Sequence, residues 1–191
     1  MTEPALRIAG IAGSLRQKSY NRGLLRAAVA VAPADVRIEI ADIGALPLFN
    51  EDVRAAGEPA AVAQLKDAVR RADGVLIATP EYNYSVPGPL KNALDWLSRP
   101  PAESPLRHKP IAVMGVTTGG FGTARAQLAL RQALLFTRSL VLTEPEVFAS
   151  RAHELFDAES NLTDEKVREA VHALVAALAA WTRKCNGVPA A

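Results

Sequence analysis

Cysteine and histidine are the scarcest reactive residues in this chain. Cysteine occurs once in 191 residues, at Cys185, and histidine occurs three times. A single thiol forms neither a disulfide framework nor a cysteine-based metal site, so we expect no metal centre and no chemical role for Cys185. No apolar run reaches the roughly 18 residues that a membrane span needs, and the opening MTEPALRIAG lacks a signal-peptide pattern. We therefore expect a protein of the cytoplasm that does not enter a membrane.

An excess of charge of one sign is also lacking. The 22 basic and 20 acidic residues leave a formal net charge of +2, and the basic residues are scattered along the chain. This balance gives no reason to expect nucleic acid as a partner. The apolar fraction of 49% is ordinary for a globular protein, and the length suits one domain with a sizeable core. We expect residues 1–191 to form a single domain.

Apolar periodicity predicts strands and helices in strict alternation. We expect strands over 6–12, 35–42, 75–80, 110–118 and 139–149. We expect helices over 21–32, 59–72, 88–99, 123–137 and 164–184, with Pro89 in a first turn and Thr163 as a helix N-cap. Residues 43–59 and 100–109 are predicted as connecting loops, and 151–164 as a polar excursion without an assigned role.

The first, third and fourth of these strands are continuously apolar, which is typical of strands buried on both faces. Alternation with helices then predicts a three-layer α/β fold with a mostly parallel sheet. In such sheets ligands bind beyond the carboxyl ends of the strands. The loops that follow these three strands are therefore the candidate functional segments.

Several familiar phosphate-binding and catalytic signatures are missing from these loops. The dinucleotide fingerprint G-x-G-x-x-G fails because Leu15 stands where its second glycine belongs, and no P-loop sequence occurs. The nucleophile elbow G-x-S-x-G is absent. The acidic residues of a receiver domain are absent too, because the first and third strands end in Gly-Ser and Thr-Pro.

The first loop, GSLRQKSYN over 13–21, combines hydroxyls, an amide and cations just before a helix. A helix N-terminus offers free N–H groups and the positive end of a dipole, which together favour an anion. We expect a terminal phosphate held here by side chains, with Ser14, Arg16, Ser19 and Asn21 as candidate ligands. The alternative is an ordinary polar turn with an N-cap.

The second and third loops are PEYNYSVPG, from residue 80, and TTGGFG, from residue 117. Two prolines stiffen the second loop, and its tyrosines and Asn83 offer flat faces and polar edges, which suits a flat heterocycle. Glycines in the third loop permit close backbone approach to a ligand, although a plain flexible turn explains them equally well. In the helix over 88–99, Trp96 lies off the apolar face, so we expect it to be half-buried or exposed to a partner.

The stretches GSLRQKSYN, PEYNYSVPGPLKNALDWLSR and the later glycine loop followed by Ala124 and Arg125 resemble the NADPH-dependent FMN reductase family. The resemblance implies a flavodoxin-like fold with a five-stranded parallel sheet in the order 2-1-3-4-5. It implies FMN as cofactor, with NADPH or NADH as co-substrate. Its implied cofactor-binding residues are Ser14, Arg16, Ser19, Tyr20, Asn21, Pro80, Glu81, Tyr82, Asn83, Thr117, Gly119 and Gly120.

The resemblance further implies that the chemistry takes place on FMN, without a catalytic side chain. Hydride would pass from nicotinamide to the flavin and then to a small acceptor such as a quinone, a flavin, an azo compound or chromate, in ping-pong order. Homodimers or homotetramers are implied as well, through the helix over 88–99 and its neighbour. The acceptor, the choice between NADH and NADPH, and the role of Arg125 stay open.

Two other functions compete with this one. A Rossmann dehydrogenase would use Asp42, at the end of the second strand, to bind ribose, but this chain lacks the glycine fingerprint of that class. A flavodoxin-like electron carrier or flavin-binding module would bind FMN without turning over NAD(P)H.

Overall fold

The computed structural model describes residues 5–187, so the ends of the predicted 1–191 domain and the first four residues of MTEPALRIAG lie outside it. Its centre is a parallel sheet with the order β2-β1-β3-β4-β5, and a sixth strand, β6, pairs with β4. The strands are β1 (Leu6–Ala12), β2 (Val36–Ala41), β3 (Gly74–Ala78), β4 (Pro110–Val116), β5 (Leu140–Val141) and β6 (Val147–Ala149). The predicted fold class and strand order are confirmed, and β6 is an addition.

The single strand predicted over 139–149 is wrong in detail. β5 pairs with the start of β4 and β6 pairs with its end, and residues 142–146 between them leave the sheet. Pro145 lies in this gap and has no N–H to donate to a ladder, which explains the interruption.

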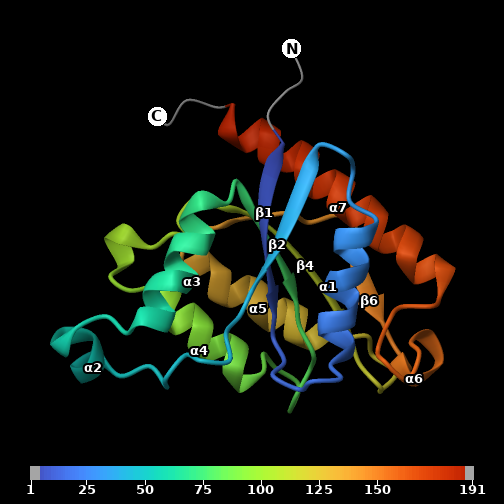
Figure 1. Ribbon diagram of the computed structural model, residues 1–191, viewed down its shortest axis with the longest axis horizontal. Helices are drawn as coiled ribbons and strands as arrows, with labels where there is room; N and C mark the ends of the chain where they lie inside the picture. The colour runs from blue at the N-terminus through green and yellow to red at the C-terminus, as the bar shows by residue number, and fades with distance from the viewer. Residues whose placement is uncertain (1–4, 188–191) are drawn as a thin grey trace.

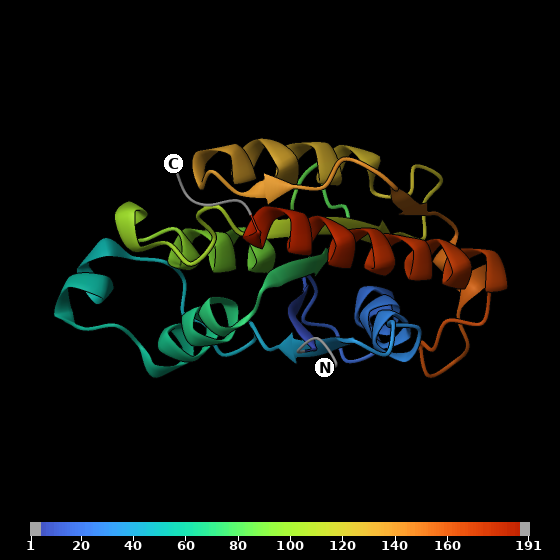
Figure 2. The ribbon, with the colours of Figure 1, turned by 90° about the horizontal axis from the view of Figure 1, so that it is seen from above.

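Helices cover both faces of the sheet (Figures 1 and 2). One face carries α1 (Tyr20–Ala30) and α7 (Glu165–Asn186), and the other carries α3 (Ala60–Arg71), α4 (Gly88–Leu97) and α5 (Ala124–Phe136). Alternation along β1 divides the core accordingly: Ile8 and Ala12 pack in the α1/α7 layer, whereas Ala9 and Ile11 pack in the α3/α4/α5 layer. Short helices complete the chain at α2 (Glu51–Ala56), η1 (Pro101–Glu103) and α6 (Ala152–Leu155).

The helix ends follow the predicted signals with one exception. Pro89 lies in the first turn of α4, as expected. The N-cap of α7, however, is Asp164, whose carboxylate accepts a bond from the Val167 N–H at 2.9 Å, while the Thr163 hydroxyl donates to the Leu155 carbonyl. Within residues 5–187, no helix combines the length and apolarity that would let it cross a membrane.

The segment predicted as a loop over 43–59 contains helix α2, and it also decides the environment of Trp96. Trp96 is fully buried, donates from its indole to the Pro47 carbonyl at 2.8 Å and meets Phe49 edge to face. The Asn92 amide fastens the same segment by bonding to Pro47 and Phe49. The expectation of a half-buried or exposed Trp96 is therefore wrong, because residues far away in sequence cover the side of α4 that its own periodicity leaves open.

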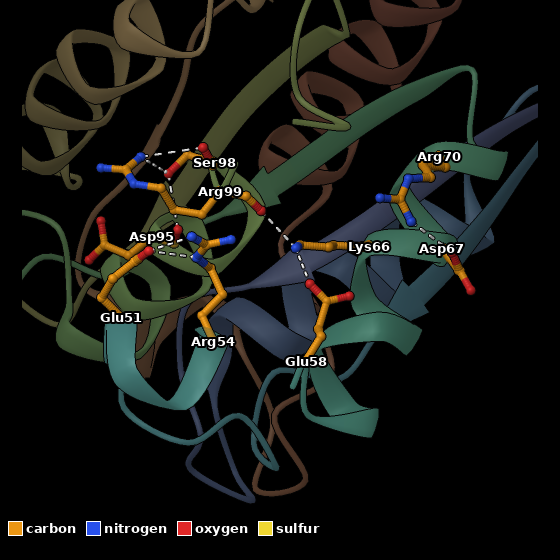
Figure 3. A network of polar contacts seen from close by, with 9 residues as sticks. All are labelled: Glu51, Arg54, Glu58, Lys66, Asp67, Arg70, Asp95, Ser98 and Arg99. Atoms are coloured by element: carbon orange, nitrogen blue, oxygen red, sulfur yellow. Dashed lines mark hydrogen bonds and ion pairs between the residues drawn. The ribbon is translucent and has the colours of Figure 1, made fainter. Parts of the chain in front are cut away.

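Figure 3 shows how the far end of this segment is anchored. The buried Lys66 of α3 makes an ion pair with Glu58 and donates to the Arg99 carbonyl at 2.7 Å. A buried ammonium needs such partners, because removing either one leaves a charge unpaired in a poorly solvated place. Lys66 of α3 therefore joins Glu58, just before α3, to Arg99, just after α4.

Candidate functional site

The first loop lies directly against the second because of Gly13. Its N–H donates to the Ala78 carbonyl at 2.8 Å. A Cβ at this position would lie 3.1–3.2 Å from side-chain atoms of Leu90, Pro80 and Pro87, which is tighter than ordinary van der Waals contact. The absence of a side chain at residue 13 thus lets the loops after β1 and β3 meet at one edge of the sheet.

The polar groups of the first loop are arranged around the start of α1. Ser19 is the N-cap, with its hydroxyl accepting from the Arg22 N–H at 3.4 Å, and the Ser14 hydroxyl accepts from the Arg16 N–H at the same distance. The first N–H groups of α1 have no acceptor within the helix. Among residues 5–187, none forms a hydrogen bond or ion pair with the Arg16 guanidinium. These donors form a seat that suits a phosphate.

Asn21 uses its amide to hold the loop in place. The buried side chain donates to the Val116 carbonyl at 2.9 Å and accepts from the Val116 N–H at 3.1 Å. It thereby fastens the start of α1 to the end of β4, which lies two strands from β1 in the sheet. Asn21 lines the cleft as predicted, but both of its polar side-chain atoms already have backbone partners.

The second loop is a two-residue hairpin. Tyr82 and Ser85 exchange backbone hydrogen bonds of 3.3 and 2.9 Å, and the turn residues Asn83 and Tyr84 have φ values of 50° and 62°. Consecutive left-handed residues are typical of a type I′ turn, whose twist matches the strands that it joins. Both tyrosine rings are exposed, and Tyr84 keeps 71% of its surface. The prolines and the turn together present flat aromatic faces on a fixed backbone.

Glu81 turns its carboxylate away from solvent and toward α5. One oxygen accepts from the backbone N–H groups of Arg125 and Ala126, each at 3.1 Å, and the other accepts from Arg125 Nε at 2.7 Å. The N-cap residue Thr123 makes no side-chain capping bond, so Glu81 performs that task from the second loop. A carboxylate at a helix N-terminus is favoured by the dipole and by charge-assisted bonds. Glu81 therefore joins the second and third loops.

The guanidinium of Arg125 is held on three sides. Besides the pairing with Glu81, its central carbon lies 3.7 Å from the centre of the Tyr84 ring and 4.4 Å from that of Phe121. Such contacts contribute roughly 0.5–1 kcal/mol each at exposed positions. The role of Arg125 that sequence left open is thus, within this chain, to fix the relative positions of the hairpin and the glycine loop.

The glycine loop is tied to the segment that follows it. Thr117 donates its N–H to the Ala149 carbonyl at 3.0 Å, and the Gly119 carbonyl accepts from the Arg151 N–H at 3.1 Å. Gly122 has a φ of 56°, and a Cβ there would lie 2.7 Å from the Phe148 backbone. A Cβ at Gly120, by contrast, would meet open space. The loop is fixed at its base and leaves backbone exposed at its tip.

The three loops form two adjoining clefts that share Glu81 and Thr117. Every predicted cofactor-binding residue lines one of them. The first cleft is lined by Ser14, Arg16, Ser19, Tyr20, Asn21, Pro80, Glu81, Tyr82, Val116, Thr117 and Thr118. The second is lined by Glu81, Asn83, Tyr84, Thr117, Gly119, Gly120, Phe121 and Arg125. Sequence reasoning did not select Val116 or Phe121, and the exposed aromatic beside a glycine pair was the available signal for Phe121.

Comparison with known proteins shows the family of the chain. The model of the NADPH-dependent FMN reductase family matches residues 6–154. An NAD(P)H-dependent FMN reductase of Pseudomonas aeruginosa is 49% identical over 95% of this chain and 98% of its own length. A quinone reductase of Pseudomonas putida is 42% identical over 92% of this chain and 94% of its own.

Among solved structures, FerB of Paracoccus denitrificans, described as a flavoenzyme NAD(P)H:acceptor oxidoreductase, superposes with a TM-score of 0.85 at 36% identity. The superposition covers 94% of this chain and 98% of that one. The chain therefore belongs to the NADPH-dependent FMN reductase family.

Proposed function

We propose that this protein is an FMN-dependent oxidoreductase that takes hydride from NAD(P)H and reduces a small flat acceptor of the quinone type. The family match confirms the enzyme class and the cofactor expected from the sequence. The observation that carries the proposal is the meeting of the three loops at one edge of the sheet. The residues that would hold a phosphate line the first cleft, and the turn of the aromatic hairpin lines the second cleft together with Gly119 and Gly120.

The donors present fit FMN by their chemistry. Ser14, Arg16 and the first N–H groups of α1 would hold its phosphate, and Ser19 would shape that seat as the N-cap. The backbone of residues 80–83, together with Thr117, Gly119 and Gly120, would contact the flavin ring. When bound, FMN supplies a ring that accepts a hydride and passes electrons to a second substrate.

The residues of the chain bind and orient. The hairpin is fixed by its turn and by Glu81, so its N–H groups and ring faces would be preorganised toward the flavin. Preorganised donors of this kind are the main electrostatic contribution that a protein makes. Glu81, the only carboxylate that lines the clefts described above, is already bonded to α5. We infer that nicotinamide and the acceptor would occupy the same open face of the flavin ring in turn, which gives ping-pong kinetics.

Self-association is a further part of the proposal. Leu128 and Leu135 on the outer side of α5 are 71% and 74% exposed, and Phe136 beside them borders a groove between α4 and α5. Apolar residues gathered on one helix face favour contact with another chain. We propose that two copies meet through α4 and α5. Changing Leu135 to Glu should yield monomers in sedimentation velocity, whereas the same change at the exposed Val29 of α1, on the opposite face of the sheet, should not. A wild-type monomer would contradict the proposal.

We further propose that residues 1–191 form one FMN-binding domain that works in the cytoplasm. The two apolar cores lie on opposite faces of one sheet and draw residues from the same strands, which favours a single folding unit. A reducing compartment suits a chain with one cysteine, and it supplies NAD(P)H. Fractionation of cells that express a tagged protein tests the location.

An anaerobic titration tests the activity. The protein is reconstituted with FMN, freed of excess flavin and titrated with NADPH and then NADH while the visible absorbance is recorded. Rapid bleaching of protein-bound flavin, followed by recovery on adding a benzoquinone, is expected of a reductase. Bound flavin that neither donor bleaches would indicate an electron carrier, and a protein that retains no flavin would contradict the assignment of all three loops.

A further inference from the structure

The polar excursion after α6 forms a small closed hairpin, residues 156–162, beyond the stretch that the family model matches. The match ends at residue 154, and the hairpin begins with an antiparallel bridge between Phe156 and Leu162. In Figures 1 and 2 this orange segment lies beside the blue start of α1. The hairpin thus lies outside the region that the family model matches and beside α1, whose first residues line the first cleft.

The hairpin is fixed internally by one carboxylate. Asp157 accepts hydrogen bonds from the N–H groups of Glu159 and Asn161 at 3.0 and 2.7 Å and from the Asn161 amide at 3.1 Å. Ser160 adopts a left-handed φ of 62° and is buried. These bonds direct the Ser160 carbonyl toward α1 in a single orientation.

The hairpin meets α1 at a position where only glycine fits. A Cβ at Gly23 would lie 2.0 Å from the Ser160 carbonyl oxygen, well inside any real contact. One turn further along, Arg26 donates to the same oxygen at 2.8 Å and to Asn161 Oδ1 at 3.2 Å. The helix and the hairpin are therefore in direct backbone contact.

The hairpin also contacts the first loop on both sides of the N-cap Ser19. The Ser160 hydroxyl donates to the Lys18 carbonyl at 3.2 Å. The Phe156 ring packs against the Tyr20 ring with centres 5.1 Å apart. Residues 18 and 20 thus have partners outside their own loop, and Ser19 between them is buried.

We propose that the hairpin 156–162 is a positioning element for the phosphate of FMN, acting through Ser160 on the first loop and through Gly23 on α1. The seat combines Ser14 and the exposed Arg16, from the loop, with N–H groups at the start of α1, so its geometry depends on how the loop and the helix are held together. A fixed support reduces the ordering cost on binding. The inference rests on the proposed function, because it takes the first cleft to be the phosphate seat.

Parallel measurements of FMN and riboflavin affinity by flavin fluorescence test the proposal, since riboflavin lacks only the phosphate. Gly23→Ala should displace the hairpin and weaken FMN binding by about tenfold or more, while riboflavin affinity stays within about twofold. Ser160→Ala creates no clash, so it serves as the second variant if Gly23→Ala does not fold. It should weaken FMN binding by a smaller factor and leave riboflavin affinity unchanged. Arg70→Ala, an exposed ion-pair residue of α3, is the control that should leave both affinities unchanged.

The outcomes separate this proposal from the proposed function. Wild-type protein that binds FMN and riboflavin equally would remove the phosphate seat, and the positioning role with it. A wild type that prefers FMN, with variants that lose both affinities in parallel or lose neither, would overturn the positioning role alone. A parallel loss would identify the hairpin as a support of overall stability only.

Discussion

The first loop and the aromatic hairpin lie at the same edge of the sheet but use their polar residues in opposite ways. In the first loop Arg16 is exposed and lines the first cleft, where under the proposed function its guanidinium would contact the phosphate. In the hairpin the carboxylate of Glu81 is buried against α5, and under the proposed function the backbone and the tyrosine rings would contact the ligand instead. A charged residue within a binding motif thus does not necessarily contact the bound molecule. It can instead hold in place the backbone that makes the contact.

The largest expected effect is on stability, and it comes from removing the buried carboxylate of Glu81. Glu81→Ala removes the acceptor for two N–H groups of α5 and for Arg125, so the free energy of unfolding of the flavin-free protein should fall by about 3 kcal/mol. Urea unfolding measures this. Glu146→Ala, a half-exposed carboxylate 4.0 Å from Arg131, is the matched control and should cost less than about 0.5 kcal/mol. Equal losses would mean that Glu81 does not brace the two loops.

Arg16→Ala should have the opposite profile. A charge-assisted bond to phosphate is worth about 1.5–3 kcal/mol, so FMN affinity should fall by about 10- to 100-fold while stability hardly changes. Equilibrium fluorescence titration measures the affinity, with Arg37→Ala on the edge strand β2 as control. An unchanged FMN affinity would remove Arg16 from the phosphate site.

A smaller effect is expected at the rim. Tyr84→Asn removes the ring beside Arg125 but keeps a residue that tolerates the left-handed turn. We expect FMN affinity within about twofold of wild type and an acceptor KM raised by about two- to fivefold, as suits the loss of one exposed aromatic contact. Steady-state kinetics with a benzoquinone measure this. A loss of FMN affinity larger than the change in KM would place the ring on the cofactor.

The smallest effect concerns pH. The N–H of Asn161, more than any other group, lowers the pKa of Asp157 below its ordinary value of 3.8. A lowered carboxyl pKa contributes stability above the unfolded-state pKa, and that contribution is lost as pH falls through the folded-state value. Between pH 6 and pH 3 the Asp157→Asn variant should therefore lose slightly less stability than wild type in urea unfolding. Asp67→Asn on α3 is the control; the same pH dependence in Asp157→Asn and wild type would contradict the prediction.

The parts that could be predicted share a physical origin. Continuous apolar strands alternating with amphipathic helices admit few arrangements other than a covered parallel sheet, and a parallel sheet brings its loops to one edge. The positions of Ser14, Thr117 and Gly120 around one site follow from that topology. The covering of Trp96 could not be predicted in the same way, because residues 47–49 approach it from 47 or more positions upstream.

By itself, the sequence determined the alternation of strands and helices, the three loops and the chemical character of each loop, since these depend on local periodicity and residue type. The strand order was implied only by the resemblance to the family. Only the tertiary structure decided that Glu81 caps α5, that Asn21 binds β4 and that Ser160 supports the first loop. Each of these contacts joins residues 44 or more positions apart. A polar side chain acts on whichever partner the fold brings within hydrogen-bonding distance, and residue type alone does not specify that partner.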